Sequence, residues 1–143
     1  MINHVFTYGS LMFKEIFMTV TGEKPHFKSA TLRHWCRYSL KDKAYPGAAV
    51  CQDENAQING VLWSGVSAQG IYKLDAFEGA EYCRQAVTVL TEGGQPQTAW
   101  IYRWIDESLF CGAWDIDAFE HRHRADFLAT HWQTYSTQSK SDL

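Results

Sequence analysis

The sequence has no long apolar run and no excess of positive charge. No stretch of its 143 residues approaches the ~18–20 consecutive apolar residues of a membrane-spanning helix. The N-terminal segment MINHVFTYGSLMF lacks the basic start and apolar stretch of a signal peptide. The formal net charge is -3, which gives no electrostatic support for binding nucleic acid or an anionic membrane. We therefore expect a cytoplasmic protein without either partner.

The cysteines form no C-x-x-C pair, and no histidine stands at metal-ligand spacing from the acidic residues described below. A chain without an export signal is expected to keep its cysteines reduced. We therefore predict no disulfide, no functional metal and four free thiols, at Cys36, Cys51, Cys83 and Cys111.

Internal repeats and a Pro/Gly/Ser-rich linker are also absent, which favours one domain. We place this domain at residues 1–135, followed by a polar C-terminal tail at 136–143. Aromatic residues are abundant, at 15% of the chain, which is typical of large buried faces and of pockets lined by rings.

Apolar periodicity predicts strands and helices interspersed along the chain. Strands are expected at 4–8, 30–40, 48–52, 58–66, 82–91 and 97–104, and helices at 12–20, 68–78 and 114–132. In the 30–40 segment, the even-numbered residues from Ala30 to Tyr38 should share one face. The proposed N-terminal caps are Ser10, Ser67 and Asp117 (with Glu120), and the proposed helix stops are Gly22 and Gly79.

The last two predicted strands flank the turn EGGQP and are expected to form a hairpin. Local connections of this kind favour antiparallel pairing. The predicted fold is α+β: a small, strongly curved, mostly antiparallel β-barrel-like sheet flanked by helices.

The second predicted helix carries acidic residues on its apolar stripe. Ile71, Leu74, Asp75 and Glu78 occupy positions i, i+3, i+4 and i+7, so two acids share the face of two apolar residues. Desolvation raises the pKa of a carboxyl group, and a raised pKa suits a general acid/base at neutral pH. Glu78 is the candidate for that role.

Simpler interpretations of the same acids stay open. Glu78 at the helix end is either exposed or paired with Arg84, and Asp75 is a structural acid that bonds backbone amides or Arg84. A carboxylate metal site is a third alternative. Cys83, beside Arg84, is either an activated thiol or a packed strand residue.

The segment YGSL, residues 8–11, joins the first predicted strand to the first helix. Unpaired amides at such a junction can hold a carboxylate or a developing oxyanion. Gly9 either lets a ligand approach the backbone or permits the turn, and a plain strand-to-helix turn is the simpler interpretation. Ser10 lacks the G-x-S-x-G context of a nucleophile.

Taken together, YGSL at 8–11, YP at 45–46 and L-D-x-F-E-G-x-x-Y-x-R at 74–84 resemble the gamma-glutamylcyclotransferase-like family. The resemblance spans residues 4–104 and implies a barrel-like mixed sheet flanked by helices. It implies that Glu78 is the catalytic acid/base and that Tyr8, Gly9, Ser10 and Leu11 bind the glutamyl group. Pocket support is expected from Tyr45, Pro46, Asp75, Tyr82, Arg84 and Tyr102.

The implied reaction is cyclisation of a small γ-glutamyl substrate to 5-oxoproline, with release of an amine and without a metal or organic cofactor. The L-D-x-F-E-G form looks closer to the gamma-glutamylamine cyclotransferase branch than to the glutathione-specific one. Two rival hypotheses stay open: a non-catalytic small-molecule binding module on the same fold, and a thiol-dependent enzyme that uses Cys83.

Overall fold

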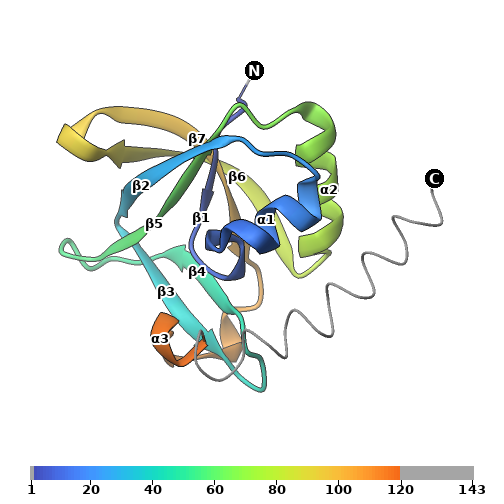
Figure 1. Cartoon of the computed structure of the whole chain (residues 1–143). Helices are drawn as coiled ribbons and strands as arrows, with labels where there is room; N and C mark the ends of the chain where they lie inside the picture. Colours follow the sequence, from blue (N-terminus) through green and yellow to red (C-terminus); the bar gives the residue numbers. More distant parts are fainter. Residues whose placement is uncertain (1, 120–143) are drawn as a thin grey trace.

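The computed structural model describes residues 2–119 and contains a closed five-stranded barrel beside a smaller sheet (Figure 1). The barrel order is β1 (Val5–Thr7), β5 (Gln57–Ser64), β2 (His26–Arg33), β6 (Tyr82–Thr91) and β7 (Pro96–Trp104). The smaller sheet consists of β4 (Pro46–Val50), β3 (Trp35–Leu40) and β8 (Phe110–Ala113). The helices are η1 (Ser10–Met12), α1 (Lys14–Thr21), α2 (Ala68–Glu78), η2 (Glu92–Gly94), η3 (Glu107–Leu109) and α3 (Ile116–Ala118).

The predicted α+β fold with a curved, mostly antiparallel barrel is confirmed. Strands β6 and β7 form the predicted hairpin, with Tyr82 opposite Trp104 at its open end. The barrel closes through one parallel contact that the sequence did not indicate, between Val5 of β1 and Trp100 of β7. The separate β4–β3–β8 sheet was not predicted either.

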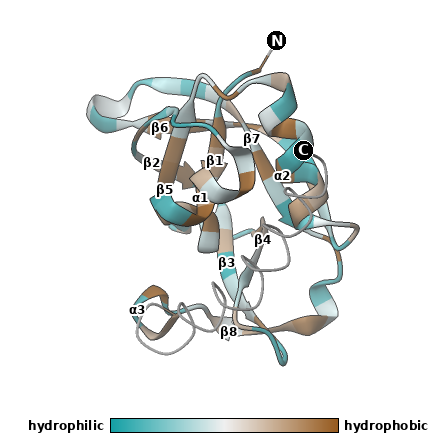
Figure 2. Ribbon diagram, turned by 45° about the vertical axis from the view of Figure 1, so that its right-hand side comes forward, coloured by the Kyte–Doolittle hydropathy of each residue, from teal (hydrophilic) through white to brown (hydrophobic). Residues whose placement is uncertain are grey.

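Two apolar clusters hold the fold together. One fills the barrel with side chains such as Phe6, Leu62 and Ile101, each at most 1% exposed. The other lies between the barrel and the helices, where the rings of Phe17 and Trp63 stack with centroids 4.0 Å apart. Figure 2 shows hydrophobic residues along β1 and β5, close to α1. Full burial of each large apolar side chain stabilises the fold by about 1.5–3 kcal/mol.

The single strand predicted at 30–40 is two strands in two different sheets. His34 adopts φ 69°, a left-handed conformation that ends β2 at Arg33 and lets β3 start at Trp35 in a new direction. Trp35 and Leu40 are the buried residues of β3, so the predicted common face of the even-numbered residues is wrong. The break has a consequence at the functional site, because it turns Arg37 toward residues 8–11.

The helix caps were predicted in part. The Ser67 hydroxyl accepts a hydrogen bond from the Gly70 N–H, and α2 ends before Gly79 as predicted. Ser10 is not the cap of α1: it lies within η1, and α1 begins after Phe13 without a side-chain cap. Asp115 caps α3 instead of Asp117. Glu120, most of the helix predicted at 114–132 and the tail at 136–143 lie outside the described residues.

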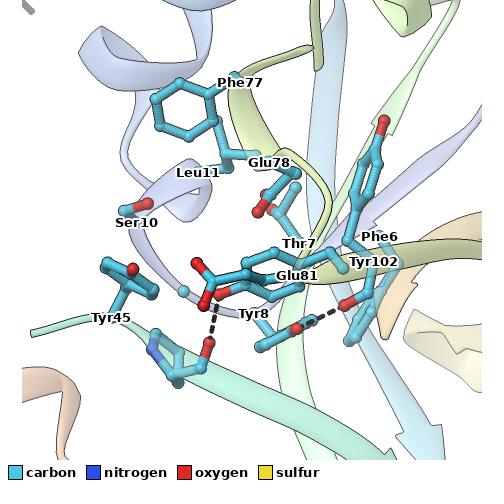
Figure 3. A pocket seen from close by; sticks show the side chains of 13 residues that line it. Phe6, Thr7, Tyr8, Ser10, Leu11, Tyr45, Phe77, Glu78, Glu81 and Tyr102 are labelled. Carbon is cyan, nitrogen blue, oxygen red and sulfur yellow. Dashed lines mark hydrogen bonds between the residues drawn. The ribbon is translucent and has the colours of Figure 1, made fainter. Parts of the chain in front are cut away.

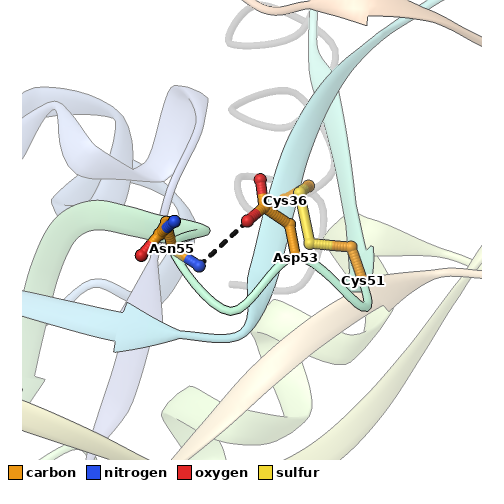
Figure 4. Close-up of a disulfide and its surroundings, with 4 residues drawn as sticks. All are labelled: Cys36, Cys51, Asp53 and Asn55. Carbon is orange, nitrogen blue, oxygen red and sulfur yellow. Dashed lines mark hydrogen bonds between the residues drawn. A yellow bond between two sulfur atoms is a disulfide. The ribbon is translucent and has the colours of Figure 1, made fainter.

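The prediction of four free thiols is wrong, because Cys36 and Cys51 form a disulfide (Figure 4). In the β3–β4 pairing Cys36 lies opposite Ala49, and Cys51 is two residues further along the chain than Ala49. The Cα atoms of Cys36 and Cys51 are 6.0 Å apart. The prediction of free thiols used only the expected redox compartment, because the sequence alone does not show which residues of two strands lie opposite each other. Disulfides are typical of oxidising compartments, so the cytoplasmic location stays a prediction. Among the described helices, none combines the length and apolarity needed to cross a bilayer.

We expect unreduced, denatured protein to titrate with two thiols, the exposed Cys83 and Cys111. The disulfide closes a loop of 15 residues. In the chain-entropy account, such a loop contributes about 3 kcal/mol to the free energy of unfolding. Reduction should therefore lower the melting temperature by roughly 6–12 °C for a domain of this size. A Cys83→Ser/Cys111→Ser variant is the control and should show the same shift. Four titrating thiols would contradict the assignment.

Candidate active site

A cavity of about 180 Å³ opens where the β1–η1 loop, the start of β4, the end of α2 and the β6–β7 hairpin meet (Figure 3). The barrel supplies one wall, α2 another, and the small sheet reaches in through its first residues. The lining residues are Phe6, Thr7, Tyr8, Gly9, Ser10, Leu11, Tyr45, Pro46, Phe77, Glu78, Glu81, Tyr82 and Tyr102.

The loop Tyr8–Leu11 lines this cavity with all four of its residues. Within residues 2–119, the N–H groups of Gly9, Ser10 and Leu11 have no hydrogen-bond acceptor. The turn instead uses the carbonyl groups of Gly9 and Ser10, which accept from Met12 and Phe13. Three consecutive free donors suit a carboxylate or an oxyanion.

Gly9 is required here for a reason that the sequence did not show. A Cβ at this position would lie 2.8 Å from the ring atoms Cγ and Cδ of Pro46, too close for any side chain. The absence of a side chain thus lets the small sheet pack directly on the loop. This contact connects the YG and YP segments, which are far apart in the sequence.

Glu78, the last residue of α2, faces the cavity opposite this loop, and Figure 3 shows its carboxyl group pointing into the space between loop and tyrosine rings. Burial raises the pKa of this carboxyl group from 4.5 to about 8. No hydrogen bond or ion pair holds it among the described residues. The alternative in which Glu78 pairs with Arg84 is wrong, since Arg84 pairs with Asp75.

Three tyrosines form the neutral polar wall of the cavity. The Tyr8 hydroxyl donates to the carbonyl of Tyr102. The Tyr82 hydroxyl donates to the carbonyl of Pro46 at 2.8 Å, and the Tyr102 hydroxyl donates to Oδ1 of Asp75 at 2.7 Å. Burial is the largest cause that raises the pKa of each phenol. All three phenols therefore stay protonated at neutral pH, and each phenol proton is held in a hydrogen bond. The pKa of Glu78, by contrast, lies in the range where a carboxyl group can take up and release a proton near neutral pH.

Asp75 and Arg84 do not line this cavity but support its tyrosine wall from an adjacent cleft. Arg84 Nε lies 3.2 Å from Asp75 Oδ1, and the guanidinium stacks over the Trp100 ring at 4.3 Å. The interpretation of Asp75 as a structural acid that bonds Arg84 is thus the one that fits.

We expect Asp75→Asn to cost stability more than rate. The amide can still accept the Tyr102 hydroxyl, but the charge-assisted contact with the partly exposed Arg84 is lost, which costs about 1 kcal/mol. Thermal melts beside a rate assay check this, and the rate per folded molecule should change less than about threefold. A loss of rate as large as that of a Glu78 variant would place Asp75 in the chemistry.

The structure brings most of the predicted site residues together: Tyr8 to Leu11, Tyr45, Pro46, Glu78, Tyr82 and Tyr102 all line the cavity. Cys83 is exposed and is not among the lining residues. Sequence reasoning missed Phe6, Thr7, Phe77 and Glu81, although the first two directly precede the YGSL motif and the other two lie within the acidic motif at 74–84. Arg37, which donates to the loop, gave no sequence signal.

Metal ligation receives no geometric support from the described part of the chain. Within residues 2–119, no three His, Cys, Asp or Glu side chains gather in a way that could hold a metal ion. The expectation that no metal or cofactor takes part in function stays a prediction.

Comparisons with known proteins agree with the fold and with the motifs. The family described as "Gamma-glutamyl cyclotransferase, AIG2-like" matches residues 5–133. The AIG2-like protein A of Arabidopsis thaliana is 30% identical over 133 residues, covering 90% of this chain and 79% of that protein. A solution structure of an Arabidopsis thaliana protein is 30% identical with a TM-score of 0.69, over 90% of this chain and 87% of that one. A structure of a "Gamma-glutamyl cyclotransferase" is 18% identical with a TM-score of 0.65, over 73% and 67%, and shows the fold alone.

Proposed function

Since the chain belongs to the gamma-glutamyl cyclotransferase, AIG2-like family, we propose that it cyclises the γ-glutamyl group of a small molecule to 5-oxoproline and releases the amine. The observation that carries this proposal is the position of Glu78, a carboxyl group with a pKa of about 8, across a cavity from three backbone N–H groups that have no acceptor in the described part of the chain. The cavity thus offers a proton acceptor and an oxyanion-binding loop to one bound molecule.

In this reaction the substrate attacks itself. Its α-amine and its γ-carbonyl belong to one molecule, so the protein mainly has to hold them in the attacking pose. The N–H groups of residues 9–11 bind the negative oxygen that forms on the carbonyl, or the α-carboxylate. The aromatic walls from Tyr45, Tyr82 and Tyr102 confine the folded substrate.

Glu78 carries the protons. Its carboxylate takes one proton from the α-ammonium group, and the freed amine attacks the γ-carbonyl carbon to form the ring C–N bond. The protonated Glu78 then gives this proton to the leaving nitrogen. A second proton follows the same route from the ring nitrogen as the old C–N bond breaks. The products are 5-oxoproline and the ammonium form of the released amine, and Glu78 ends as the carboxylate with which it began.

For the leaving group we propose an amine, because the form L-D-x-F-E-G at residues 74–79 resembles that of the gamma-glutamylamine cyclotransferase branch. The reaction requires no metal and no organic cofactor, since every step is a proton transfer or an acyl transfer within the substrate. We expect γ-glutamyl amines to be converted faster than γ-glutamyl dipeptides or glutathione.

The test is a panel of γ-glutamyl amines, γ-glutamyl dipeptides and glutathione, scored for 5-oxoproline by chromatography. An enzyme yields 5-oxoproline and free amine in equal amounts from at least one compound. The rival hypothesis, a binding module, predicts that a compound binds and is recovered unchanged. Alkylation of the exposed Cys83 serves as a control: it should leave turnover intact, whereas a thiol-dependent enzyme would lose it.

A further inference from the structure

Arg37 contacts the binding loop but is not among the residues that line the cavity. It lies in β3, where it is paired with Ala48 of β4. Its Nη1 donates a hydrogen bond of 2.9 Å to the carbonyl oxygen of Tyr8, and its guanidinium lies 5.2 Å from the centre of the Trp114 ring. The side chain is half-buried, and burial lowers the pKa of its guanidinium. Within residues 2–119 it makes no ion pair with a carboxylate.

A partly buried cation that has no carboxylate partner within residues 2–119 is costly, so its position calls for a physical reason. Neither the carbonyl of Tyr8 nor the face of Trp114 carries a full negative charge. An apolar side chain of similar length would fill the same space without the cost of desolvation. The cation is therefore more than a packing element.

The geometry of the peptide group connects Arg37 to the cavity. The peptide between Tyr8 and Gly9 is trans, like every described peptide bond, so its C=O and N–H point in opposite directions. A bond that holds the Tyr8 carbonyl toward Arg37 directs the Gly9 N–H away from Arg37. Gly9 lines the cavity, and its N–H has no acceptor among the described residues.

The Tyr8–Gly9 peptide needs such an anchor. Glycine has no Cβ and therefore restricts the rotation of the preceding peptide less than any other residue does. No other hydrogen bond to the Tyr8 carbonyl occurs within residues 2–119 outside the β1 ladder. A donor to the carbonyl also polarises the amide and makes its N–H a stronger donor.

We propose that Arg37 is a positioning residue, which fixes the Tyr8–Gly9 peptide so that the Gly9 N–H donates to the oxyanion formed on the γ-glutamyl carbonyl. This inference rests on the proposed function and adds to it the donor that acts in the transition state. Since the oxyanion forms only during reaction, Arg37 contributes to kcat and little to substrate binding.

The variants are Arg37→Met, which keeps the length and removes the charge, Arg37→Lys, which keeps a cationic donor, and the matched control Arg33→Met on an exposed arginine of β2. Loss of one oxyanion donor costs about 10²–10³ in kcat, and a misdirected donor costs part of this. We expect Arg37→Met to lower kcat by about 10- to 100-fold with KM within threefold. Arg37→Lys should regain part of the loss, and Arg33→Met should match the wild type.

A second readout does not depend on turnover. In ¹H–¹⁵N spectra of the ligand-free protein, the Gly9 amide signal should move in Arg37→Met, stay close to its wild-type position in Arg37→Lys, and remain unchanged in Arg33→Met. If Arg37→Met does not fold, Arg37→Lys carries the test through the kcat and KM values and the same signal.

The outcomes test the role of Arg37 and the proposed function separately. A wild type that turns over while Arg37→Met keeps full kcat overturns the inference and leaves the proposed function standing. A rise of KM at unchanged kcat also overturns it, because Gly9 would then bind the ground state. If the wild type makes no 5-oxoproline, the proposed function fails and the oxyanion role fails with it, while the Gly9 signal still shows whether Arg37 fixes the peptide.

Discussion

Glu78→Gln should lower the rate of 5-oxoproline release by about two to four orders of magnitude, the usual contribution of a positioned acid/base. The amide keeps the shape of the carboxyl group and can still form hydrogen bonds, but it cannot accept a proton from the α-ammonium group. The loss should appear in kcat, because Glu78 acts in the proton transfers of the reaction and not in holding the substrate. Steady-state kinetics on the best substrate of the panel measures it.

The control for this variant is its stability across pH. The pKa of Glu78 is about 8 in the folded protein and 4.5 in ordinary surroundings, so between these values the folded state holds a proton that the unfolded state has released. The free energy of unfolding of the wild type therefore falls as pH rises from about 4.5 to 8. Glu78→Gln lacks this decrease in stability with pH. The melting temperature of the variant should therefore exceed that of the wild type by a margin that grows from about pH 4.5 to 8. A folded variant with near-native turnover would remove Glu78 from the mechanism.

The second large effect is the pH dependence of the wild type. A base with a pKa of about 8 is almost entirely protonated at pH 6, so kcat/KM should rise about tenfold from pH 6 to 7 and level off above pH 8. At higher pH the substrate loses its own α-ammonium proton, and the profile should turn down. Initial rates between pH 5.5 and 10 on a γ-glutamyl amine give this profile.

The residual activity of Glu78→Gln is the matched comparison for the profile. The rise through pH 8 should disappear in the variant, because the group that titrates is gone. A wild-type profile that is flat from pH 6 to 8, or a rise that survives in the variant, would mean that another group controls the rate.

The β6–β7 hairpin, α2 and the carboxylate of the cavity could be predicted because each depends on local sequence. Ser67 and Gly79 bound α2, and the spacing of Leu74 and Glu78 shows which face the acid shares. The EGGQP turn produces the β6–β7 hairpin by its own chemistry. In these cases the residues that determine the structure lie within one element or one turn.

The features that could not be predicted depend on contacts between distant segments. The left-handed residue His34 sends β3 into a second sheet, and no pattern within 30–40 marks that break. Both the Cys36–Cys51 bond and the contact of Arg37 with the loop follow from it. Gly9 was explained by a ligand or a turn, whereas its close neighbour is Pro46.

The central claim is that the Glu78 carboxyl group exchanges a proton near neutral pH inside the cavity, and a direct titration tests it. The ¹³C signal of this carboxyl group can be assigned by its absence in Glu78→Gln and followed from pH 4 to 10. The account predicts a midpoint at about 8 that coincides with the rise of kcat/KM. A midpoint near the ordinary value of 4.5 would contradict it, because Glu78 would then be an exposed, permanently ionised group.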